Sequence, residues 1–530
     1  MKHILKYKFH ILAGVVVIVL HFLLRIYNLT GQPIFADEAI YIRWAQVMQA
    51  EPTLRFLPLS DGKQPLFMWS IIPFFKLFND PLFAGRVVSV VASFVTLVGI
   101  FSLTYYLFRK WFVSIVSALI YAVSPFAIFF DRMALADSML SMFGVWVLLF
   151  GIITAKSLRL DSAMLTGFAL GGGLLTKSPA LFYSLLLPST LLVSPALKLT
   201  RYIRISWQKL AKFIGLFLVT YAIGYAMYNI LRLGPNFSSI GARNQDYVLP
   251  LSHIITNPKD PFIFLFHRSF EWLWILGPFG ILVLATLGIF VGIRKYPKEI
   301  LLLSAWFFVP IAVQSEFAKV FTARYVLFSI PPLVVVASLV FLIKGGIRNR
   351  VAIVGLIIFL LHAFFIDYHL IVRMDQAFLP QSERAGYFEE WTAGTGTREV
   401  AQFIKDYKKS NPESRIVVGT DGFFGTMPDG IQIYIEDIPG ITVVGVGITI
   451  DKVSEKLLNA KKSGDAVYLV VNSSRFRATA EELGLELIES YPKAKRLEND
   501  SREAILFGER DYLLFFEVKE KALTSEKNKV

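Results

Sequence analysis

The sequence has 530 residues, of which 55% are hydrophobic and only 18% are charged, which excludes an ordinary soluble protein. The chain contains no cysteine, which excludes disulfides and thiolate metal sites. A formal net charge of +14 would suit a nucleic-acid-binding protein, but most basic residues fall between long apolar segments. The composition therefore predicts a multi-pass membrane protein.

Apolar windows of about 17 to 25 residues are long enough to cross a bilayer as helices. They predict about eleven transmembrane helices, at residues 10–27, 84–108, 112–130, 137–155, 162–176, 179–197, 213–233, 272–293, 300–317, 325–343 and 351–370. The first is expected to remain as a span, because no small-residue cleavage site follows it before Asp37. The shorter run from Leu66 to Phe78 contains Pro73 and Lys76, so it predicts an interfacial helix.

The basic residues predict the orientation, because short cytoplasmic loops are enriched in Lys and Arg. The loops on one side collect Lys2, Lys6, Lys8, Arg109, Lys110, Lys156, Arg159, Lys198, Arg201, Arg204, Lys209, Lys212, Arg294, Lys295, Lys298, Lys344, Arg348 and Arg350. These loops contain almost no acids, so we expect them and the N-terminus on the cytoplasmic side of the plasma membrane. Topology and contact with anionic membrane lipids then account for the positive charge, and no nucleic-acid partner is expected.

An acidic pair, Asp37 and Glu38, follows the first predicted span and is expected at the extracytoplasmic membrane surface. An ionisable group at the bilayer edge is costly and tends to be kept for chemistry, so the pair suggests a catalytic or metal-binding site. The alternative is a helix N-terminus. A short helix with Tyr41, Trp44 and Met48 on one face would begin here, and acids suit its positive dipole end.

Two cations come next on the same predicted side. Lys63, in the turn Lys63-Gln64-Pro65-Leu66, is able to hold a lipid phosphate as a point charge, although a lysine at this depth also snorkels to headgroups. Arg86 opens the second predicted span, and an arginine inside a membrane segment usually meets a carboxylate or a phosphate. Its available partners are Asp37, Glu38 or a bound anion.

Two further turns add charge at the same surface. Asp131, Arg132 and Asp137 lie between two spans, where Asp137 is also suited to cap a helix starting at Ser138. Lys177 closes a glycine-rich span, where a snorkelling lysine would be unremarkable.

The later outer loops carry Arg243, Asp246, His253, His267, Arg268, Lys319 and Arg324. Each of these alone is typical of a solvated loop. Together with the earlier residues they indicate one outward-facing site with one or two acids and several cations. Transfer from a phosphate leaving group needs this combination: a base to deprotonate an acceptor hydroxyl, and fixed positive charge to stabilise the departing phosphate.

From residue 373 onward the composition becomes that of a soluble domain. A helix after Thr397, strand-like runs and a second helix alternate along it, which predicts a small α/β domain. The strand-like runs lie at 415–419, 441–446, 466–471 and 512–518, and the second helix at 451–460. The glycine-rich loops at 394–396 and 422–430 lack a clean phosphate-binding pattern and are expected to be ordinary turns.

The predicted domains are therefore a membrane domain at 1–372 with an outer loop at 28–83, an extracytoplasmic α/β domain at 373–518, and a charged tail at 519–530.

The order of these motifs resembles the GT-C membrane glycosyltransferases, in the branch of the protein O-mannosyltransferases and the lipid A aminoarabinose transferases. The matching motifs are Phe35-Ala36-Asp37-Glu38, Lys63-Gln64-Pro65-Leu66, Gly85-Arg86-Val87-Val88-Ser89, Asp137, Leu175-Thr176-Lys177-Ser178, and Arg324-Tyr325 with Pro331-Pro332. The resemblance covers about residues 10–370. Two motifs depart from the family pattern, since Gln64 replaces a proline and Val87-Val88 replaces Leu-Pro.

The resemblance implies a GT-C-like fold and transfer of a sugar, with inversion, from a polyprenyl-phosphate donor to a glycan, lipid or protein acceptor of the cell envelope. It implies that Asp37 is the general base, and we expect Glu38 to orient or bind the acceptor. Lys63 would contact the lipid phosphate, and Arg86 would organise the acidic loop or the phosphate. The other candidate phosphate ligands are Arg243, Arg268 and Arg324, and the other candidate cavity residues are Arg132, Asp137 and Lys177.

Asp37, Glu38 and Asp137 are able to supply oxygen ligands to a divalent cation. The branch that the sequence resembles is not known for needing a metal, so no metal site or other cofactor is assigned.

The main alternative function is a secondary transporter or lipid flippase whose polar outer residues line a pathway. A transporter is expected to place ionisable groups and broken helices near the bilayer midplane, often in two matching halves. Here the polar residues gather at one predicted rim and the halves do not match, so we favour the enzyme. A non-catalytic scaffold for the C-terminal domain would explain neither Lys63 nor Arg86.

Overall fold

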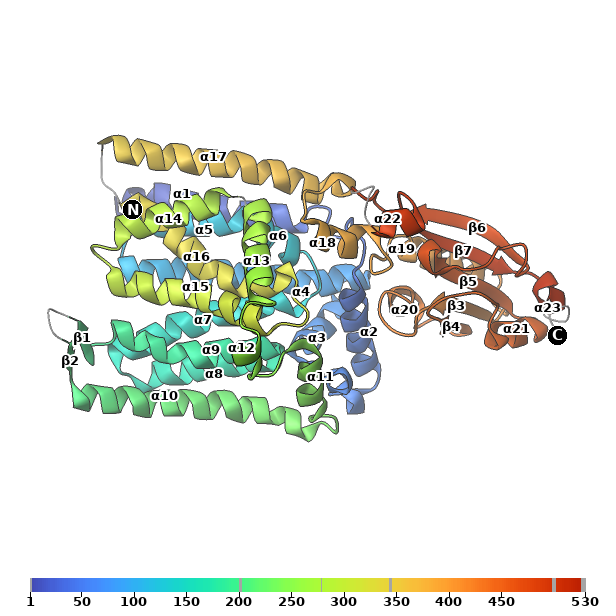
Figure 1. Ribbon diagram of the computed structural model, residues 1–530, viewed down its shortest axis with the longest axis horizontal. Helices are drawn as coiled ribbons and strands as arrows, with labels where there is room; N and C mark the ends of the chain where they lie inside the picture. The colour runs from blue at the N-terminus through green and yellow to red at the C-terminus, as the bar shows by residue number, and fades with distance from the viewer. Residues whose placement is uncertain (1, 200–202, 278, 343–345, 498–501, 526–530) are drawn as a thin grey trace. The chain divides into compact units, whose positions relative to one another are not determined.

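The computed structural model describes residues 2–199, 203–277, 279–342, 346–497 and 502–525 (Figure 1). The chain divides into two compact units. Unit 1 comprises Met1–Leu29, Glu51–Ser70 and Arg86–Pro380, and unit 2 comprises Thr30–Ala50, Ile71–Gly85 and Gln381–Val530. Arg201 and Lys344 of the predicted cytoplasmic loops, and residues 526–530 of the predicted tail, lie outside the described residues.

Within the described residues, seven helices are long and apolar enough to cross a membrane. They are α1 (Lys2–Ile26), α4 (Pro81–Phe108), α7 (Ala136–Ser157), α10 (Trp207–Tyr228) with η6 (Asn229–Leu233), α15 (Pro297–Phe317), α16 (Ile330–Ser338) with η7 (Ala323–Ser329) and η8 (Leu339–Leu342), and α17 (Gly346–Ile371). Two bent pairs raise the number to as many as nine. They are α5 (Trp111–Ala122) with α6 (Pro125–Asp131), bent by 57°, and α13 (Phe262–Leu276) with α14 (Gly280–Gly292), bent by 104°.

The helical membrane fold is confirmed, whereas the predicted number of eleven spans is not. The predicted span at 162–176 falls on α8 (Leu160–Thr176), which has only 17 residues. The predicted span at 179–197 falls on the shorter apolar segment Ser178–Val193, in which α9 (Leu181–Leu186) is flanked by 3-10 turns. The expected short helix at 66–78 is present as α3 (Leu66–Ile71), which continues into η3 (Ile72–Lys76).

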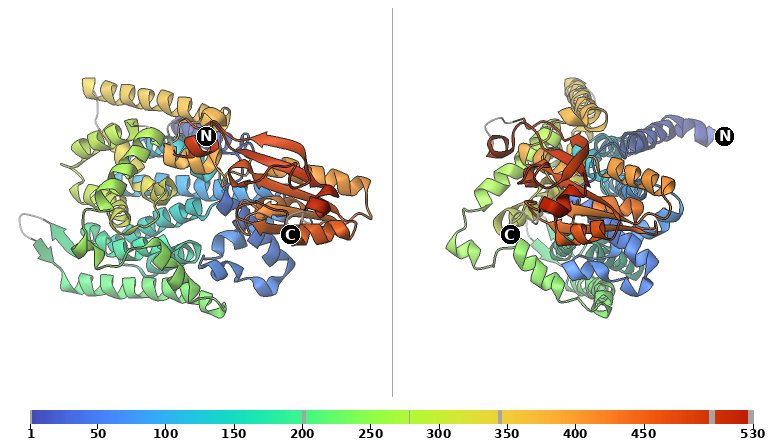
Figure 2. Two further views of the ribbon diagram at one scale, coloured as in Figure 1. Left: turned by 45° about the vertical axis from the view of Figure 1, so that its right-hand side comes forward. Right: turned by 90° about the vertical axis from the view of Figure 1, so that its right-hand side faces the viewer.

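Three of the long helices show mostly apolar side chains on the surface of unit 1. In α1, α10 and α17, Leu12, Leu218 and Leu361 are among the large apolar residues that are more than half exposed. Figure 1 shows α10 and α17 along opposite edges of the helices of unit 1, and in the right-hand view of Figure 2 the N-terminal half of α1 projects beyond its neighbours. Such surfaces are stable when lipid rather than water covers them.

Glycines let α8 pack closely between α7 and α10. A Cβ at Gly172 would overlap the ring of Phe143 in α7, and a Cβ at Gly171 would lie 2.5 Å from the sulfur of Met227 in α10. Small residues at such contacts allow helix backbones in membranes to approach one another. The glycines that weaken the apolar signal of this segment are therefore part of its packing.

Unit 2 contains a five-stranded sheet in the order β4-β3-β5-β7-β6. The strands are β3 (Ile416–Asp421), β4 (Ile441–Gly447), β5 (Ala466–Asn472), β6 (Leu485–Pro492) and β7 (Tyr512–Val518). β3 is parallel to β4 and β5, whereas β7 is antiparallel to both β5 and β6. The four predicted strands and the two predicted helices, now α19 (Thr397–Ser410) and α21 (Glu455–Lys462), are present.

The elements of unit 2 that escape the sequence prediction include a strand and a short helix. The edge strand β6 alternates poorly in hydrophobicity, because Glu486 and Glu489 lie within it. The short helix α20 (Asp429–Ile435) follows a segment rich in glycine that also contains Pro428, where an ordinary turn was expected. Another helix of this unit, α2 (Ala36–Ala50), comes from the predicted outer loop at 28–83.

Candidate functional site

The acidic pair lies in the first turn of α2, in unit 2. Glu38 is fully buried, and its Oε2 accepts a hydrogen bond of 2.9 Å from the backbone N–H of Phe35, which satisfies a donor at the helix start. Asp37 is half-buried. The helix interpretation of the pair is therefore correct for Glu38, while Asp37 is the more accessible carboxylate.

One face of α2 packs into unit 2, as predicted from its apolar spacing. Tyr41, Trp44 and Met48 are buried, and the Gln46 side-chain amide donates a 2.8 Å hydrogen bond to the carbonyl oxygen of Ile433 in α20. The Arg43 guanidinium forms an ion pair of 2.5 Å with Glu436. The acidic pair thus sits on a helix that is fixed along its whole length.

In unit 1, Lys63 and Arg243 meet at the carboxylate of Asp61. The Lys63 Nζ lies 3.6 Å from Asp61 Oδ2, and the Arg243 Nε lies 3.4 Å from Asp61 Oδ1. Arg243, in α11 (Ser239–Tyr247), also forms a 3.1 Å ion pair with Asp246. Two predicted phosphate ligands, about 180 positions apart in the chain, therefore share one carboxylate.

Gly62 makes this approach of α11 possible. Its φ is +66°, in the left-handed region that favours glycine, and a Cβ at this position would lie 2.5 Å from Arg243 Cβ. Sequence reasoning missed Asp61, although an acid two positions before Lys63 was the available signal.

Lys177 and Arg324 lie over one tyrosine ring, and Asp137 pairs with Lys177. The Lys177 Nζ lies 2.6 Å from Asp137 Oδ1, and Asp137 is almost fully buried. Lys177 lies over the ring of Tyr325 at 4.5 Å from its centroid, and the Arg324 guanidinium lies at 5.4 Å. Asp137 does not cap the helix, because α7 begins at Ala136 with Leu135 as its N-cap residue.

A hydrogen bond of 2.8 Å from Gln64 Nε2 to Ser178 Oγ joins the Lys63 turn to the Lys177 turn. We call Lys63, Lys177, Arg243 and Arg324, with Asp61 and Asp137, the cation cluster. Its members come from segments far apart in the sequence and all belong to unit 1. These contacts bring the Lys63 and Lys177 turns together within unit 1.

Arg86 and Arg132 have a different environment, at the C-terminal end of α1. Arg86 is fully buried and donates a 2.8 Å hydrogen bond to the Leu29 carbonyl oxygen. Arg132 donates to four backbone carbonyls, those of Leu24, Arg25, Tyr27 and Asn28. The last carbonyls of a helix lack intrahelical partners and carry partial negative charge, so Arg132 stabilises the end of α1. Arg86 instead holds Leu29, in the segment that follows this helix.

Sequence reasoning also missed a buried ion pair. Arg25 and Asp131, both fully buried, approach to 2.9 Å, and Asp131 accepts further hydrogen bonds from Ser138 and Tyr121. Asp131 is thereby engaged by Arg25 inside unit 1. The signal was an arginine inside the first apolar run.

Arg268 lies in α13, with its guanidinium 4.7 Å from the centroid of the Phe264 ring. Among the contacts of the described residues, none joins Arg268 to the cation cluster. Within the described residues there is also no group of three or more His, Asp or Glu side chains arranged to hold a metal ion.

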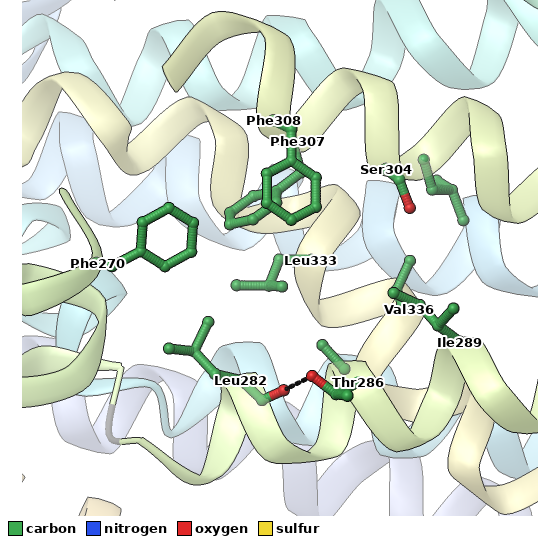
Figure 3. Close-up of a pocket in the computed structure, with 11 residues that line it drawn as sticks. Phe270, Leu282, Thr286, Ile289, Ser304, Phe307, Phe308, Leu333 and Val336 are labelled. Carbon is green, nitrogen blue, oxygen red and sulfur yellow. Dashed lines mark hydrogen bonds between the residues drawn. The ribbon is translucent and has the colours of Figure 1, made fainter. Parts of the chain in front are cut away.

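A cavity of about 250 Å³ lies between α13, α14, α15 and α16 (Figure 3). Its lining is almost wholly apolar and includes Phe270, Phe307, Phe308 and Leu333. The Thr286 hydroxyl at its edge is occupied by a 2.8 Å hydrogen bond to the Leu282 carbonyl oxygen. The cavity suits a hydrocarbon group rather than a charged one.

Comparisons with known proteins agree with these observations. The family model described as dolichyl-phosphate-mannose-protein mannosyltransferase matches residues 62–224, the part of the chain that contains Lys63, Asp137 and Lys177. No curated protein matches the chain.

Similar solved structures cover nearly the whole chain. The structure of ArnT from Cupriavidus metallidurans in the apo state has a TM-score of 0.60 and 13% identity, and covers 98% of this chain and 99% of its own. The same protein bound to undecaprenyl phosphate has a TM-score of 0.55, 13% identity, and coverage of 97% and 99%.

The archaeal oligosaccharyltransferase AglB from Archaeoglobus fulgidus, in complex with an inhibitory peptide and a dolichol-phosphate, has a TM-score of 0.50, 12% identity, and coverage of 88% and 70%. The resemblance to the GT-C membrane glycosyltransferases is thereby confirmed, and the chain has their fold.

Proposed function

We propose that this membrane protein of the GT-C fold transfers a sugar from a polyprenyl-phosphate donor to an acceptor outside the cytoplasm. The observation that carries the proposal is the cation cluster, in which lysines and arginines from separate segments of unit 1 come together. Two of these cations, Lys63 and Lys177, lie in turns between helices, where a lipid phosphate is proposed to bind.

The cation cluster supplies what a phosphate leaving group requires. Lys63 and Arg243 both approach Asp61, and Arg243 also pairs with Asp246, so these acids hold the two cations in place. Lys177 provides a second ammonium group, which the almost fully buried Asp137 holds in place. Fixed cations of this kind stabilise the negative charge that develops as the sugar–phosphate bond breaks.

Asp37 is proposed as the general base. It accepts the proton of the acceptor hydroxyl while the hydroxyl oxygen forms a bond to the anomeric carbon, and the electron pair of the breaking bond leaves with the lipid phosphate. Attack from the face opposite the phosphate inverts the anomeric configuration. Glu38, which accepts from the Phe35 N–H, orients the helix start and, through it, Asp37.

Arg86 is proposed to act on the donor phosphate indirectly, because its hydrogen bond to the Leu29 carbonyl orders the segment that follows α1. Arg132 has a similar role. Arg324 is the favoured second phosphate-binding arginine over Arg268, because it contacts the same tyrosine ring as Lys177.

Two observations support a polyprenyl donor. The similar structures include one bound to undecaprenyl phosphate and one in complex with a dolichol-phosphate. The apolar cavity between α13, α14, α15 and α16 is suited to part of a prenyl chain. The acceptor is proposed to be a glycan, lipid or protein of the cell envelope, with unit 2 outside the cytoplasm and the N-terminus inside.

The test uses the full-length chain, purified in detergent and returned to lipid nanodiscs, with a panel of polyprenyl-phosphate sugars and a cell-envelope extract as acceptor. We expect release of polyprenyl phosphate with at least one donor, and a product of inverted configuration by NMR. Absence of release across the panel, or vectorial movement of the intact donor in proteoliposomes without transfer, would overturn the proposal.

A further inference from the structure

A short segment of unit 2 pairs with the three residues that precede the acidic pair. The Gly394 N–H donates a 2.7 Å hydrogen bond to the Ile34 carbonyl, and the Ala36 N–H donates a 3.2 Å bond to the Thr392 carbonyl. Phe35 and Ala393 form an antiparallel bridge between them. We call residues 386–394 the strap.

Side chains reinforce this pairing. The ring of Phe35 packs against Tyr387 of the strap with centroids 4.6 Å apart, and Ile34 is buried. A Cβ at Gly394 would overlap the Ile34 side chain and would lie 2.9 Å from the Ile34 carbonyl oxygen. The strap therefore fits the start of α2 with no space for even one methyl group at Gly394.

The strap is also anchored to the sheet by buried charge. The Lys493 Nζ, which is fully buried, donates a 2.8 Å hydrogen bond to the carbonyl of Glu390 and lies 3.5 Å from Asp511. The guanidinium of Arg475 stacks on the ring of Trp391 at 3.8 Å and forms a 3.3 Å ion pair with Asp421. Burying a charged side chain costs free energy because water is lost from it. For Lys493 and Asp421, the contacts with these partners offset part of that cost.

The backbone adds a further link between the strap and the segment after β6, since the Ala494 N–H donates 3.1 Å to the Phe388 carbonyl. Within the strap, the Thr392 hydroxyl donates 2.6 Å to the Gly386 carbonyl. A set of ion-pair, ring and hydrogen-bond contacts thus leads from Asp421 at the carboxyl end of β3, through the strap, to the first turn of α2.

We propose that the strap is a positioning element for the acidic pair, so that the C-terminal α/β unit forms part of the catalytic apparatus. The inference rests on the proposed role of Asp37 as general base. It assigns no contact with substrate to the strap itself. Its physical reason is that catalytic groups must be held close to one geometry, because a misplacement on the order of 1 Å costs about 100-fold in rate.

The first experiment compares two glycine variants in the donor-release assay. Gly394→Ala disturbs the contact with Ile34, whereas the matched control Gly430→Ala adds a Cβ that would lie 3.6 to 3.9 Å from Thr397, Ile34 and Ala39, in ordinary contact. We expect Gly394→Ala to lower kcat by about 10- to 100-fold with the donor KM within about twofold, and Gly430→Ala to remain near wild type. An unchanged kcat, or a change confined to KM, would overturn the inference.

A milder variant covers the case in which Gly394→Ala fails to fold. Thr392→Val removes the hydroxyl that donates to Gly386 and keeps the shape of the side chain. We expect a smaller fall in kcat from this variant, again with little change in KM. Equal kcat in wild type and Thr392→Val, when Gly394→Ala is unfolded, would count against the strap.

A second readout is independent of turnover. Because the chain contains no cysteine, Asp37→Cys introduces a unique thiol that can carry a nitroxide spin label. We expect an immobilised EPR spectrum in the otherwise wild-type and Gly430→Ala backgrounds, and a more mobile one with Gly394→Ala. Identical spectra would overturn the positioning role even if transfer is active. If Gly394→Ala makes the spin label more mobile but the wild-type protein shows no sugar transfer, the result would contradict the proposed function. It would still support the positioning role of the strap.

Discussion

Lys177 and Asp137 form an ion pair of 2.6 Å, although 40 positions separate them in the chain. The carboxylate is almost fully buried and the ammonium group is half-buried over the ring of Tyr325. This ion pair stabilises the fold, and in our proposal its lysine also binds the donor phosphate. The two can be separated by experiment.

Lys177→Met leaves Asp137 as a buried carboxylate without its cation, and we expect it to lower the free energy of unfolding by about 3 to 5 kcal/mol. The double variant Lys177→Met with Asp137→Leu removes both charges and is expected to regain most of that stability. Thermal unfolding of the full chain in detergent measures both effects. If Lys177 contacts the donor phosphate, the double variant stays inactive in the release assay. Recovery of activity with stability would show that the lysine is only structural.

Lys63→Gln removes a cation from the cluster, and we expect the KM for the donor to rise by about 10- to 100-fold, the size of a lost charge-assisted hydrogen bond. Asp61→Asn removes the competing negative charge beside Lys63 and Arg243 and is expected to lower that KM. Initial rates against donor concentration decide the matter. The cluster would not bind phosphate if both variants shifted KM in the same direction.

Asp37→Asn is expected to reduce kcat by about 100- to 10,000-fold, the usual contribution of a general base. Glu38→Gln is its matched control, because a glutamine oxygen can still accept from the Phe35 N–H, and we expect a loss below about tenfold. Near-normal turnover by Asp37→Asn in a folded protein would exclude it as the base. A reversal of the two effects would assign the base to Glu38.

Leu333→Trp is expected to fill part of the apolar cavity between α13, α14, α15 and α16. If this cavity takes the prenyl chain, the KM should rise for long-chain donors and stay unchanged for donors with a short prenyl chain. The short-chain donor is the internal control, because it tests folding and catalysis in the same variant. Equal changes for both donors would argue against the cavity as a lipid site.

Asp429 gives a prediction about pH. Burial raises the pKa of its carboxyl from 3.8 to about 6, against the opposing effects of the Gly425 N–H, which donates 2.7 Å to it, and of Arg43. The folded state therefore holds the proton more tightly than the unfolded state. The contribution of this carboxyl to the free energy of unfolding is fully present below about pH 4. It falls as the pH rises toward 6, by up to about 3 kcal/mol.

Asp429→Asn should remove this loss, because it is uncharged and its amide oxygen still accepts from Gly425. We expect the variant to gain stability over wild type at pH 7 and to match it near pH 4, as measured by thermal unfolding at both values. A difference that does not change with pH would contradict the assignment.

Sequence reasoning found the elements whose signal is local. The long apolar runs, the buried face of α2 and the strands β3, β5 and β7 depend on residues close together in the chain, and each is present. Motif order also placed Lys63, Asp137 and Lys177 on one predicted face, and contacts within unit 1 bring their turns together.

The remaining features depend on partners that a sequence does not display. Arg132 was predicted to be a cavity residue, but its partners are backbone carbonyls at and just after the end of α1. A backbone carbonyl is present at every residue, so the sequence does not identify it as a partner. Arg86 hydrogen-bonds the backbone carbonyl of Leu29, which lies beyond the end of α1. The membership of α2 in unit 2 was missed because the pairing of Phe35 with Ala393 joins distant parts of the chain.

That pairing has a consequence for biosynthesis. The helix that carries Asp37 leaves the ribosome before the strap and the sheet, which follow much later in the chain. At about 5 to 20 residues per second, roughly 350 further residues take about 20 to 70 s to synthesise. During that interval the acidic helix lacks its final neighbours, so nascent chains that stop before the strap should contain the acids and the cations but no organised catalytic centre.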